Sequence, residues 1–224
     1  MEIWQEQRQD RATPTSGFAP EIEGRQMAAQ DDRTLNFYTR EAAAYTTRVQ
    51  GASERRLLGF LAHLPAGGPV LELGCGAGQD SQFMIARGFA VRPTDGTPEI
   101  AQAAERRLGI PVATLLFDEL DESETCDGIW ANACLLHVPR ADLAAILKRI
   151  HAALKPGGVF HASFKAGRAE GRDQFDRYYN YPSEAWLREL YGAFDWEIAI
   201  EAGFGSGFDN KPTDWLYVTA IRPG

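Results

Sequence analysis

Three glycines spaced two residues apart follow a short apolar run in the sequence VLELGCGAGQD, residues 70–80. Glycine adopts positive φ angles without strain, and its missing side chain lets the backbone approach a bound molecule closely. Beyond this GCGAG segment, candidate polar side chains stand at Asp95 and His137. A carboxylate only accepts hydrogen bonds and so suits the two hydroxyls of a ribose, whereas histidine exchanges a proton near neutral pH. These residue types predict a site for a nucleotide-like ligand.

The spacing of the glycines argues against three common kinds of site. A dinucleotide fingerprint, G-x-G-x-x-G, requires glycine where Gln79 stands. A phosphate-binding P-loop requires a lysine after its last glycine, and no lysine precedes Lys148. A nucleophile elbow requires serine or cysteine at the centre of the segment, where Gly76 stands. The segment therefore predicts neither a nicotinamide site nor acyl-transfer chemistry.

The elements that must position these residues alternate between strand and helix. Apolar runs predict buried strands at residues 69–74, 89–95, 111–117, 126–133 and 159–164. Helical patterns lie between them, and Thr97 followed by Pro98 is typical of a helix start. The alternation predicts a parallel, doubly wound sheet that binds its ligand at the carboxyl ends of the strands.

Two further strands are predicted near the carboxyl terminus, at residues 196–204 and 214–222. The segment between them, GSGFDNKPT, is too short for the crossover that parallel neighbours need, so antiparallel pairing is expected. The predicted fold class is therefore α/β: a doubly wound, Rossmann-like, seven-stranded sheet with its last strand antiparallel and helices on both faces.

The length of 224 residues suits one α/β domain with short appended segments. Residues 1–30 are polar and lack periodicity, which predicts a mobile N-terminal arm. The domain is expected over residues 31–224, and its first part, residues 31–63, predicts N-terminal cap helices. Residues 166–182 are polar and aromatic, follow the fifth strand, and form the predicted substrate loop.

The composition limits the kinds of molecule that the protein is expected to bind. A net charge of −8 disfavours association with nucleic acid and favours a small-molecule partner.

Three cysteines without a C-x-x-C pair, and an N-terminus without a signal pattern, predict reduced thiols and a cytoplasmic location. No apolar run approaches the ~18 residues of a membrane span, so no membrane partner is expected. Histidines and cysteines lack metal-ligand spacing, so no metal site is predicted. The oligomeric state is left open.

Over roughly residues 31–222 the chain resembles the class I S-adenosylmethionine-dependent methyltransferases. Their first motif, an acidic residue followed by x-G-x-G-x-G, matches Glu72 to Gly78 in full. The small bacterial enzymes of the tellurite-resistance and ubiquinone-biosynthesis types are most similar in overall pattern. The resemblance implies S-adenosyl-L-methionine as cofactor, S-adenosyl-L-homocysteine as product, and methyl transfer by in-line displacement.

The resemblance also implies roles for single residues. Asp95 would take the ribose hydroxyls, and Asp118 would lie near the adenine amino group. The segment WANACLLHVP would place the backbone of Asn132 and Ala133 beside the cofactor and His137 at the rim of the pocket. The complete set of cofactor-binding residues is expected to be Tyr38, Tyr45, Glu72, Gly74, Cys75, Gly76, Gly78, Asp95, Gly96, Asp118, Asn132 and Ala133.

Methyl transfer needs a base only if the acceptor must lose a proton, and His137 is the candidate catalytic base. Its apolar neighbours equally favour a role in packing, and both interpretations stay open. For the acceptor, arginine suits carboxylate or phosphate, although pairing with aspartates inside the loop is an equal alternative. The predicted substrate-binding residues are Arg168, Arg172, Arg177, Tyr178 and Tyr181.

Two alternatives to a small-molecule methyltransferase remain. An RNA methyltransferase would need a basic groove, for which the loop arginines are the only obvious start. A non-catalytic module that binds S-adenosylmethionine for regulation would keep the cofactor pocket without an acceptor pocket. The sequence NACL stands where methyltransferases of DNA adenine and protein glutamine carry N/D-P-P-Y/F, which argues against those two targets.

Overall fold

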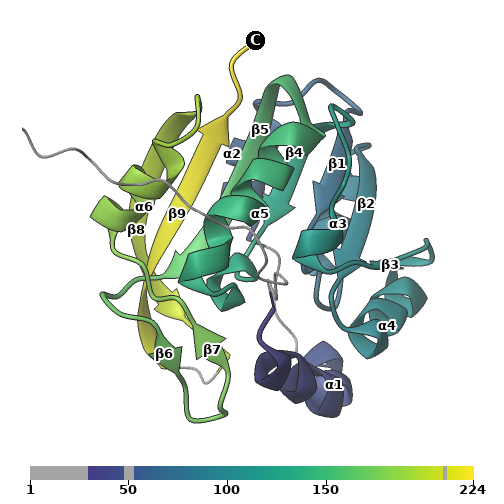
Figure 1. The fold of residues 1–224 in the computed structure, drawn as a ribbon. Helices are drawn as coiled ribbons and strands as arrows, with labels where there is room; N and C mark the ends of the chain where they lie inside the picture. Colours follow the sequence, from purple (N-terminus) through teal and green to yellow (C-terminus); the bar gives the residue numbers. More distant parts are fainter. Residues whose placement is uncertain (1–29, 48–52, 209–210) are drawn as a thin grey trace, which may run out of the picture.

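The computed structural model describes residues 30–47, 53–208 and 211–224. Of the predicted N-terminal arm, all but Gln30 therefore lies outside the described residues. Within the described part, no helix is long and apolar enough to cross a membrane. The chain folds around one central sheet with helices packed on both faces (Figure 1).

The sheet has seven strands in the order β3-β2-β1-β4-β5-β9-β8. The neighbours from β3 to β5 pair in parallel, and β9 runs antiparallel to both β5 and β8. The predicted fold class is thus confirmed, including the antiparallel strand. The strands span β1 Pro69–Glu72, β2 Ala90–Asp95, β3 Ala113–Thr114, β4 Cys126–Ala131, β5 Leu154–Lys165, β8 Glu197–Ser206 and β9 Pro212–Ile221.

Helices cover the two faces of the sheet, and one helix lies at the carboxyl ends of its parallel strands. On one face α5 and α6 cover β4, β5 and β9, and on the other α2 and α3 pack over the central strands. In Figure 1, α1 lies below the carboxyl ends of the parallel strands, beside α4. The helices span α1 Asp32–Thr47, α2 Glu54–Leu61, α3 Gln79–Ile85, α4 Pro98–Leu108, α5 Arg140–Ala153 and α6 Glu184–Tyr191.

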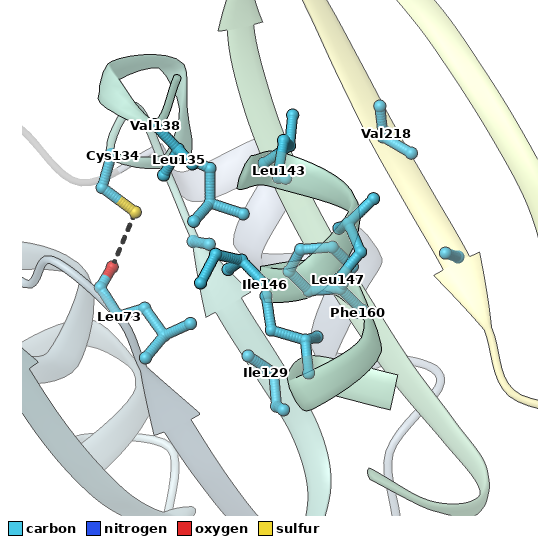
Figure 2. Packing of buried hydrophobic residues seen from close by; sticks show 14 of the residues in the cluster. Leu73, Ile129, Cys134, Leu135, Val138, Leu143, Ile146, Leu147, Phe160 and Val218 are labelled. Atoms are coloured by element: carbon cyan, nitrogen blue, oxygen red, sulfur yellow. Dashed lines mark hydrogen bonds between the residues drawn. The ribbon is translucent and has the colours of Figure 1, made fainter. Parts of the chain in front are cut away.

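The main core lies between α5 and the sheet, and it holds the segment after β4 in place (Figure 2). Leu135 and Val138, which flank His137 in sequence, are fully buried there. The Cys134 thiol donates a hydrogen bond of 3.1 Å to the carbonyl of Leu73, just ahead of the glycine loop. The core thereby joins the turn after β1 to the turn after β4.

Two predicted elements differ from those observed. The third strand, expected at 111–117, is only Ala113–Thr114, because the following residues turn into a short 3-10 helix, η1 (Phe117–Glu119). Its first turn is closed by Glu119, whose carboxylate accepts a hydrogen bond from the Leu116 N–H. The expected loop 166–182 contains a hairpin of two short strands, whereas residues 31–63, expected to form cap helices, hold α1 and α2. The hairpin strands are β6 Gly171–Arg172 and β7 Tyr178–Tyr179.

Candidate functional site

A pocket opens at the carboxyl ends of β1, β2 and β4, where strand order reverses beside β1. Its empty space, open solvent at the mouth included, is about 710 Å³. The lining residues come from α1, the turns after these strands and η1. They are Gln30, Asp31, Thr34, Leu35, Tyr38, Tyr45, Gly74, Asp95, Gly96, Thr97, Ile100, Leu115, Leu116, Phe117, Asn132, Ala133, Cys134 and His137.

The glycine loop needs glycine for both conformation and space. Gly74 and Gly76 have φ angles of +65° and +56°, which side chains disfavour. A Cβ on Gly74 would lie 2.5 Å from the Cβ of Cys134. A Cβ on Gly76 would lie 3.3 Å from the ring of Tyr45, because α1 places that ring over the loop. The loop backbone is therefore the floor beneath the aromatic residues of α1.

Asp95 joins the glycine loop to the turn after β2. One carboxylate oxygen accepts the Gly76 N–H at 3.0 Å, and the other accepts the Thr97 N–H at 2.9 Å. Burial raises the pKa of Asp95 to about 6, although both backbone hydrogen bonds favour the ionised form. Each oxygen retains a second lone pair, and the side chain lines the pocket, so it can accept further hydrogen bonds there.

Glu72 lies beneath the loop and does not line the pocket. The Ser81 hydroxyl, at the start of α3, donates a hydrogen bond to its carboxyl group. Burial raises the pKa of Glu72 well above its ordinary range, and the nearby Asp80 and Asp95 charges act in the same direction. Glu72 therefore supports the loop from below.

The pocket wall after β3 is apolar, and the next residue, the half-buried Asp118, does not itself line the pocket. Leu115, Leu116 and Phe117 line the pocket instead of continuing the strand. The Oδ1 atom of the adjacent Asp118 is buried and has no hydrogen-bond donor among the described residues. An apolar slot beside a buried acceptor fits the ring and exocyclic amino group of a purine.

The turn after β4 is held by a network of hydrogen bonds. Ala133 adopts a φ of +54°, and its N–H donates to the Ser163 hydroxyl of β5 at 2.8 Å. Ser163 donates in turn to the Asn132 side-chain oxygen at 2.7 Å. The Asn132 amide donates to Asp80, which also accepts the Trp130 indole N–H. This network fixes the Asn132–Ala133 backbone at the pocket wall.

His137 is placed at the pocket wall with both ring nitrogens bonded. Nδ1 lies 2.6 Å from the Tyr178 carbonyl, which can only accept, so Nδ1 carries the proton. Nε2 then accepts the Tyr38 hydroxyl at 3.0 Å. Burial lowers the pKa of His137 to about 3, and the charges of Arg177 and Lys165 lower it further. His137 is therefore neutral.

The predicted substrate residues lie behind this histidine, and none of them lines the pocket. Arg172 forms an ion pair of 2.6 Å with Asp31, and Arg168 is exposed on the surface. The Tyr178 hydroxyl donates to Glu170, and Tyr181 packs on Tyr179. Asp31 lies outside the loop. Pairing inside the loop, one of the two alternatives above, is seen for Arg172 with Asp176 at 3.6 Å and for Arg177 with Asp173 at 2.6 Å.

Arg177 lies at the centre of the contacts between the hairpin and α1, and it is only 1% exposed. Its guanidinium donates to Asp173 at 2.6 Å and to the Tyr38 hydroxyl at 3.2 Å. Aromatic rings surround it at 4.7 to 5.8 Å, namely Phe37, Tyr38, Phe175, Tyr179 and Phe208. We refer to residues 30–47 and 171–181 together as the cover, because α1 closes the pocket from one side and the hairpin packs on α1.

Several pocket residues were not predicted from the sequence. The Leu115–Phe117 segment was assigned to a strand, and Thr34 and Leu35 were assigned only to a cap helix. Lys165 lines a separate cleft and was not assigned a role, although it ends β5 at the carboxyl edge where ligands bind in such sheets. Strand polarity alone could have indicated Lys165. The residues of α1 gave no comparable signal, because helix position over the pocket depends on tertiary contacts.

Comparison with known proteins finds a matching family for part of the chain. Residues 70–158 match the family described as "Methyltransferase domain". Trans-aconitate 2-methyltransferase of Paracidovorax citrulli is 30% identical over 150 residues, which cover 63% of this chain and 52% of that protein. Ubiquinone biosynthesis O-methyltransferase of Paramagnetospirillum magneticum is 33% identical over 96 residues, covering 41% of this chain and 38% of that protein. The chain spans about half the length of the curated relatives it matches, or less.

A solved structure extends the similarity to nearly the whole fold. The 1,6-didemethyltoxoflavin-N1-methyltransferase of Burkholderia thailandensis, solved with 1,6-didemethyltoxoflavin and S-adenosylhomocysteine, aligns with a TM-score of 0.68. The alignment covers 91% of this chain and 94% of that chain at 23% identity. The fold, the glycine motif and the sequence matches together support a class I S-adenosylmethionine-dependent methyltransferase, with the family model matched over residues 70–158.

Proposed function

We propose that this chain binds S-adenosyl-L-methionine in the pocket at the carboxyl ends of β1, β2 and β4, and transfers its methyl group to a small molecule. One observation carries the proposal: Gly74 of the glycine loop, Asp95 and the Asn132–Ala133 turn follow three different strands and line a single pocket. The relatives' names refer to small molecules, trans-aconitate and ubiquinone, which supports a small-molecule acceptor.

The pocket offers a suitable group for each part of the cofactor. Asp95 would accept the ribose hydroxyls with the lone pairs that its backbone hydrogen bonds leave available. The buried Asp118 oxygen would accept the adenine amino group, and Phe117 would contact the adenine ring. The glycine loop, of which Gly74 lines the pocket, would lie beneath the methionine part.

The bound cofactor supplies an electrophilic methyl group on a positively charged sulfur. The chain has to hold the acceptor in line with this group and exclude water, and alignment alone contributes on the order of 7–11 kcal/mol in favourable cases. Tyr38 and Tyr45 close the pocket from α1, with their rings 5.2 Å apart. Their electron-rich faces would stabilise a nearby cation by about 0.5–2 kcal/mol.

The catalytic role of His137 stays a prediction. The neutral ring lines the pocket, but its only lone pair accepts the Tyr38 hydroxyl. To act as a base, His137 would have to release Tyr38 and become positively charged beside Arg177. The geometry favours a role in which His137 orients Tyr38 at the pocket wall.

Calorimetric titration with S-adenosylhomocysteine, with NADH in parallel, tests the proposal. We expect micromolar binding of S-adenosylhomocysteine and no binding of NADH. Asp95→Ala is expected to weaken this binding strongly, and the exposed Asp121→Ala is the matched control that should leave it unchanged. Binding of NADH alone, or of neither ligand, would overturn the proposal.

The two alternative functions lead to different results in the same preparation. An RNA methyltransferase would label total RNA with a radioactive methyl group, but the described arginines Arg172 and Arg177 are already paired with Asp31 and Asp173. A regulatory module would bind S-adenosylhomocysteine and methylate no acceptor in any panel. The proposed enzyme would instead methylate a small molecule and leave RNA unlabelled.

A further inference from the structure

We propose that Gln30 belongs to the binding site, and that its side-chain oxygen accepts a hydrogen bond from the exocyclic amino group of the cofactor's adenine. Gln30 has this role only if the pocket holds S-adenosylmethionine, so the assignment rests on the proposed function. Two independent observations support it: the hydrogen-bonding state of the Gln30 side chain, and the direction in which α1 crosses the pocket.

The Gln30 side chain has an unpaired oxygen. Its Oε1 atom is buried and has no hydrogen-bond donor among the described residues, and Gln30 lines the pocket. Within residues 30–47, 53–208 and 211–224, no other pocket-lining residue has a buried polar side-chain atom without a partner. Most buried polar atoms in proteins are paired, and an unpaired one is costly. A ligand that brings an N–H or O–H donor to this oxygen is therefore favoured.

The residue that follows Gln30 holds the main chain in place. Asp31 accepts the Thr34 N–H at 2.9 Å, which closes the first turn of α1. It also accepts both terminal guanidinium nitrogens of Arg172, at 3.0 and 2.6 Å. The Thr34 hydroxyl accepts the backbone N–H of Tyr178 at 2.8 Å. The start of α1, and Gln30 with it, is thus anchored to the hairpin.

The direction of α1 places Gln30 away from the glycine loop. Near the carboxyl end of this helix, the ring of Tyr45 lies over Gly76, where a Cβ would be 3.3 Å from it. The helix begins thirteen positions earlier, at Asp32, which at a rise of about 1.5 Å per residue corresponds to roughly 20 Å. Gln30 precedes that start, so it lies far from the part of the pocket floor that is proposed to hold the methionine part.

The first turns of α1 face the part of the pocket that is proposed to hold the base. A Cβ on Gly96, in the turn after β2, would lie 3.7 Å from Cδ2 of Leu35 and 3.4 Å from Cδ2 of Leu116. The start of α1 and the apolar wall after β3 are therefore close together at this turn. Gln30 precedes Leu35 by five positions and lines the same pocket as Phe117.

The adenine amino group is the donor of the cofactor that suits this oxygen. It has two N–H bonds, so a contact with Asp118 leaves one of them for Gln30, whose amide oxygen is an acceptor. The ribose hydroxyls are assigned to Asp95, and the ammonium of the methionine part lies toward the glycine loop. Of the cofactor's donors, the amino group is thus the one that remains for Gln30.

Calorimetric titration with two ligands tests the contact. The first is S-adenosylhomocysteine, and the second is its analogue with hydrogen in place of the 6-amino group. We expect Gln30→Leu to bind S-adenosylhomocysteine about tenfold more weakly than the unchanged protein does, as for the loss of one hydrogen bond to a buried group. Gln30→Glu, which keeps an acceptor oxygen, should retain most of the affinity. The exposed Gln102→Leu is the matched control.

The analogue separates a direct contact from a structural effect. Gln30→Leu should bind the analogue at least as tightly as the unchanged protein does, because the donor that Gln30 would accept is missing from it. Equal weakening for both ligands, or no weakening for S-adenosylhomocysteine, would refute the contact with the amino group. In either case S-adenosylhomocysteine still binds to the unchanged protein, whereas failure of the proposed function would abolish that binding.

Discussion

The glycine loop and the cover meet at the same pocket, but different interactions hold them. The loop is fixed by main-chain hydrogen bonds to Asp95, by positive φ angles and by the packing of Cys134 against Gly74. The cover is fixed by side chains from distant parts of the chain, above all by Arg177 and its contacts with Asp173 and Tyr38.

Because of this difference, we expect the loop to contribute mainly to ligand affinity and the cover mainly to stability. The loop lies at the ends of central strands and presents backbone groups, so changes there should alter ligand affinity more than stability. The cover is one helix and one hairpin joined by a buried charge, so changes at that charge should alter stability first. Four predictions test this division, beginning with the largest expected effect.

Removal of the central charge of the cover should have the largest effect. Arg177→Ala would leave Asp173 and the Tyr38 hydroxyl without their shared donor in a mostly buried setting. We expect the free energy of unfolding to fall by about 3–5 kcal/mol, as for other broken buried ion pairs. Urea denaturation measures the change, and the exposed Arg168→Ala is the control. A loss below ~1 kcal/mol would mean that aromatic packing alone holds the cover.

Asp95→Ala should act mainly on affinity. The substitution removes the acceptor for the Gly76 and Thr97 N–H groups as well as the proposed acceptor for the ribose. We expect binding of S-adenosylhomocysteine to weaken about 100-fold, close to 2.7 kcal/mol, as for the loss of charge-assisted hydrogen bonds. Calorimetry provides the measurement. If affinity is unchanged while stability falls, Asp95 serves only the loop.

The pH dependence of binding should report the same carboxyl group. Its pKa in the ligand-free protein is raised by burial to about 6, so it is ionised at pH 7 and mostly protonated at pH 5. Hydroxyl donors favour the ionised form, and affinity should therefore be highest above pH 6 and fall about tenfold between pH 7 and pH 5. Asp95→Asn, which cannot ionise, should bind equally at both values. A similar decrease in that variant would assign the titration to another group.

The smallest effect is expected at the exposed side of the cover. Arg172 pairs with Asp31 at 2.6 Å, but its side chain is 34% exposed. Arg172→Ala should therefore lower the free energy of unfolding by less than about 1 kcal/mol, and the loss should shrink in 1 M salt. Thermal denaturation at two salt concentrations measures it. A loss as large as that of Arg177→Ala would remove the distinction between the buried and exposed charges of the cover.

The sequence indicated where the glycine loop and Asp95 lie because the requirements of these residues are local. GCGAG follows a buried strand, and Asp95 ends the next one, so strand polarity alone brings both to one edge. The third strand was predicted too long, since the apolar residues Leu115–Phe117 resemble a strand in sequence but line the pocket.

The contacts within the cover could not be predicted in the same way. Arg177 and Tyr38 are 139 positions apart, and nothing in the local pattern of either segment indicates that they share a hydrogen bond. The loop was interpreted as a candidate substrate site because arginine suits anions, and tertiary contacts decided that its buried arginine binds Asp173.

By itself, then, the sequence determined the sheet, the glycine loop and Asp95, because strand alternation and positive φ angles are properties of neighbouring residues. Only the tertiary structure decided the protonation of His137 and the neighbours of Lys165 and Arg177. Burial and charge pairing depend on which distant segments are in contact, and the packing of the whole chain determines those contacts.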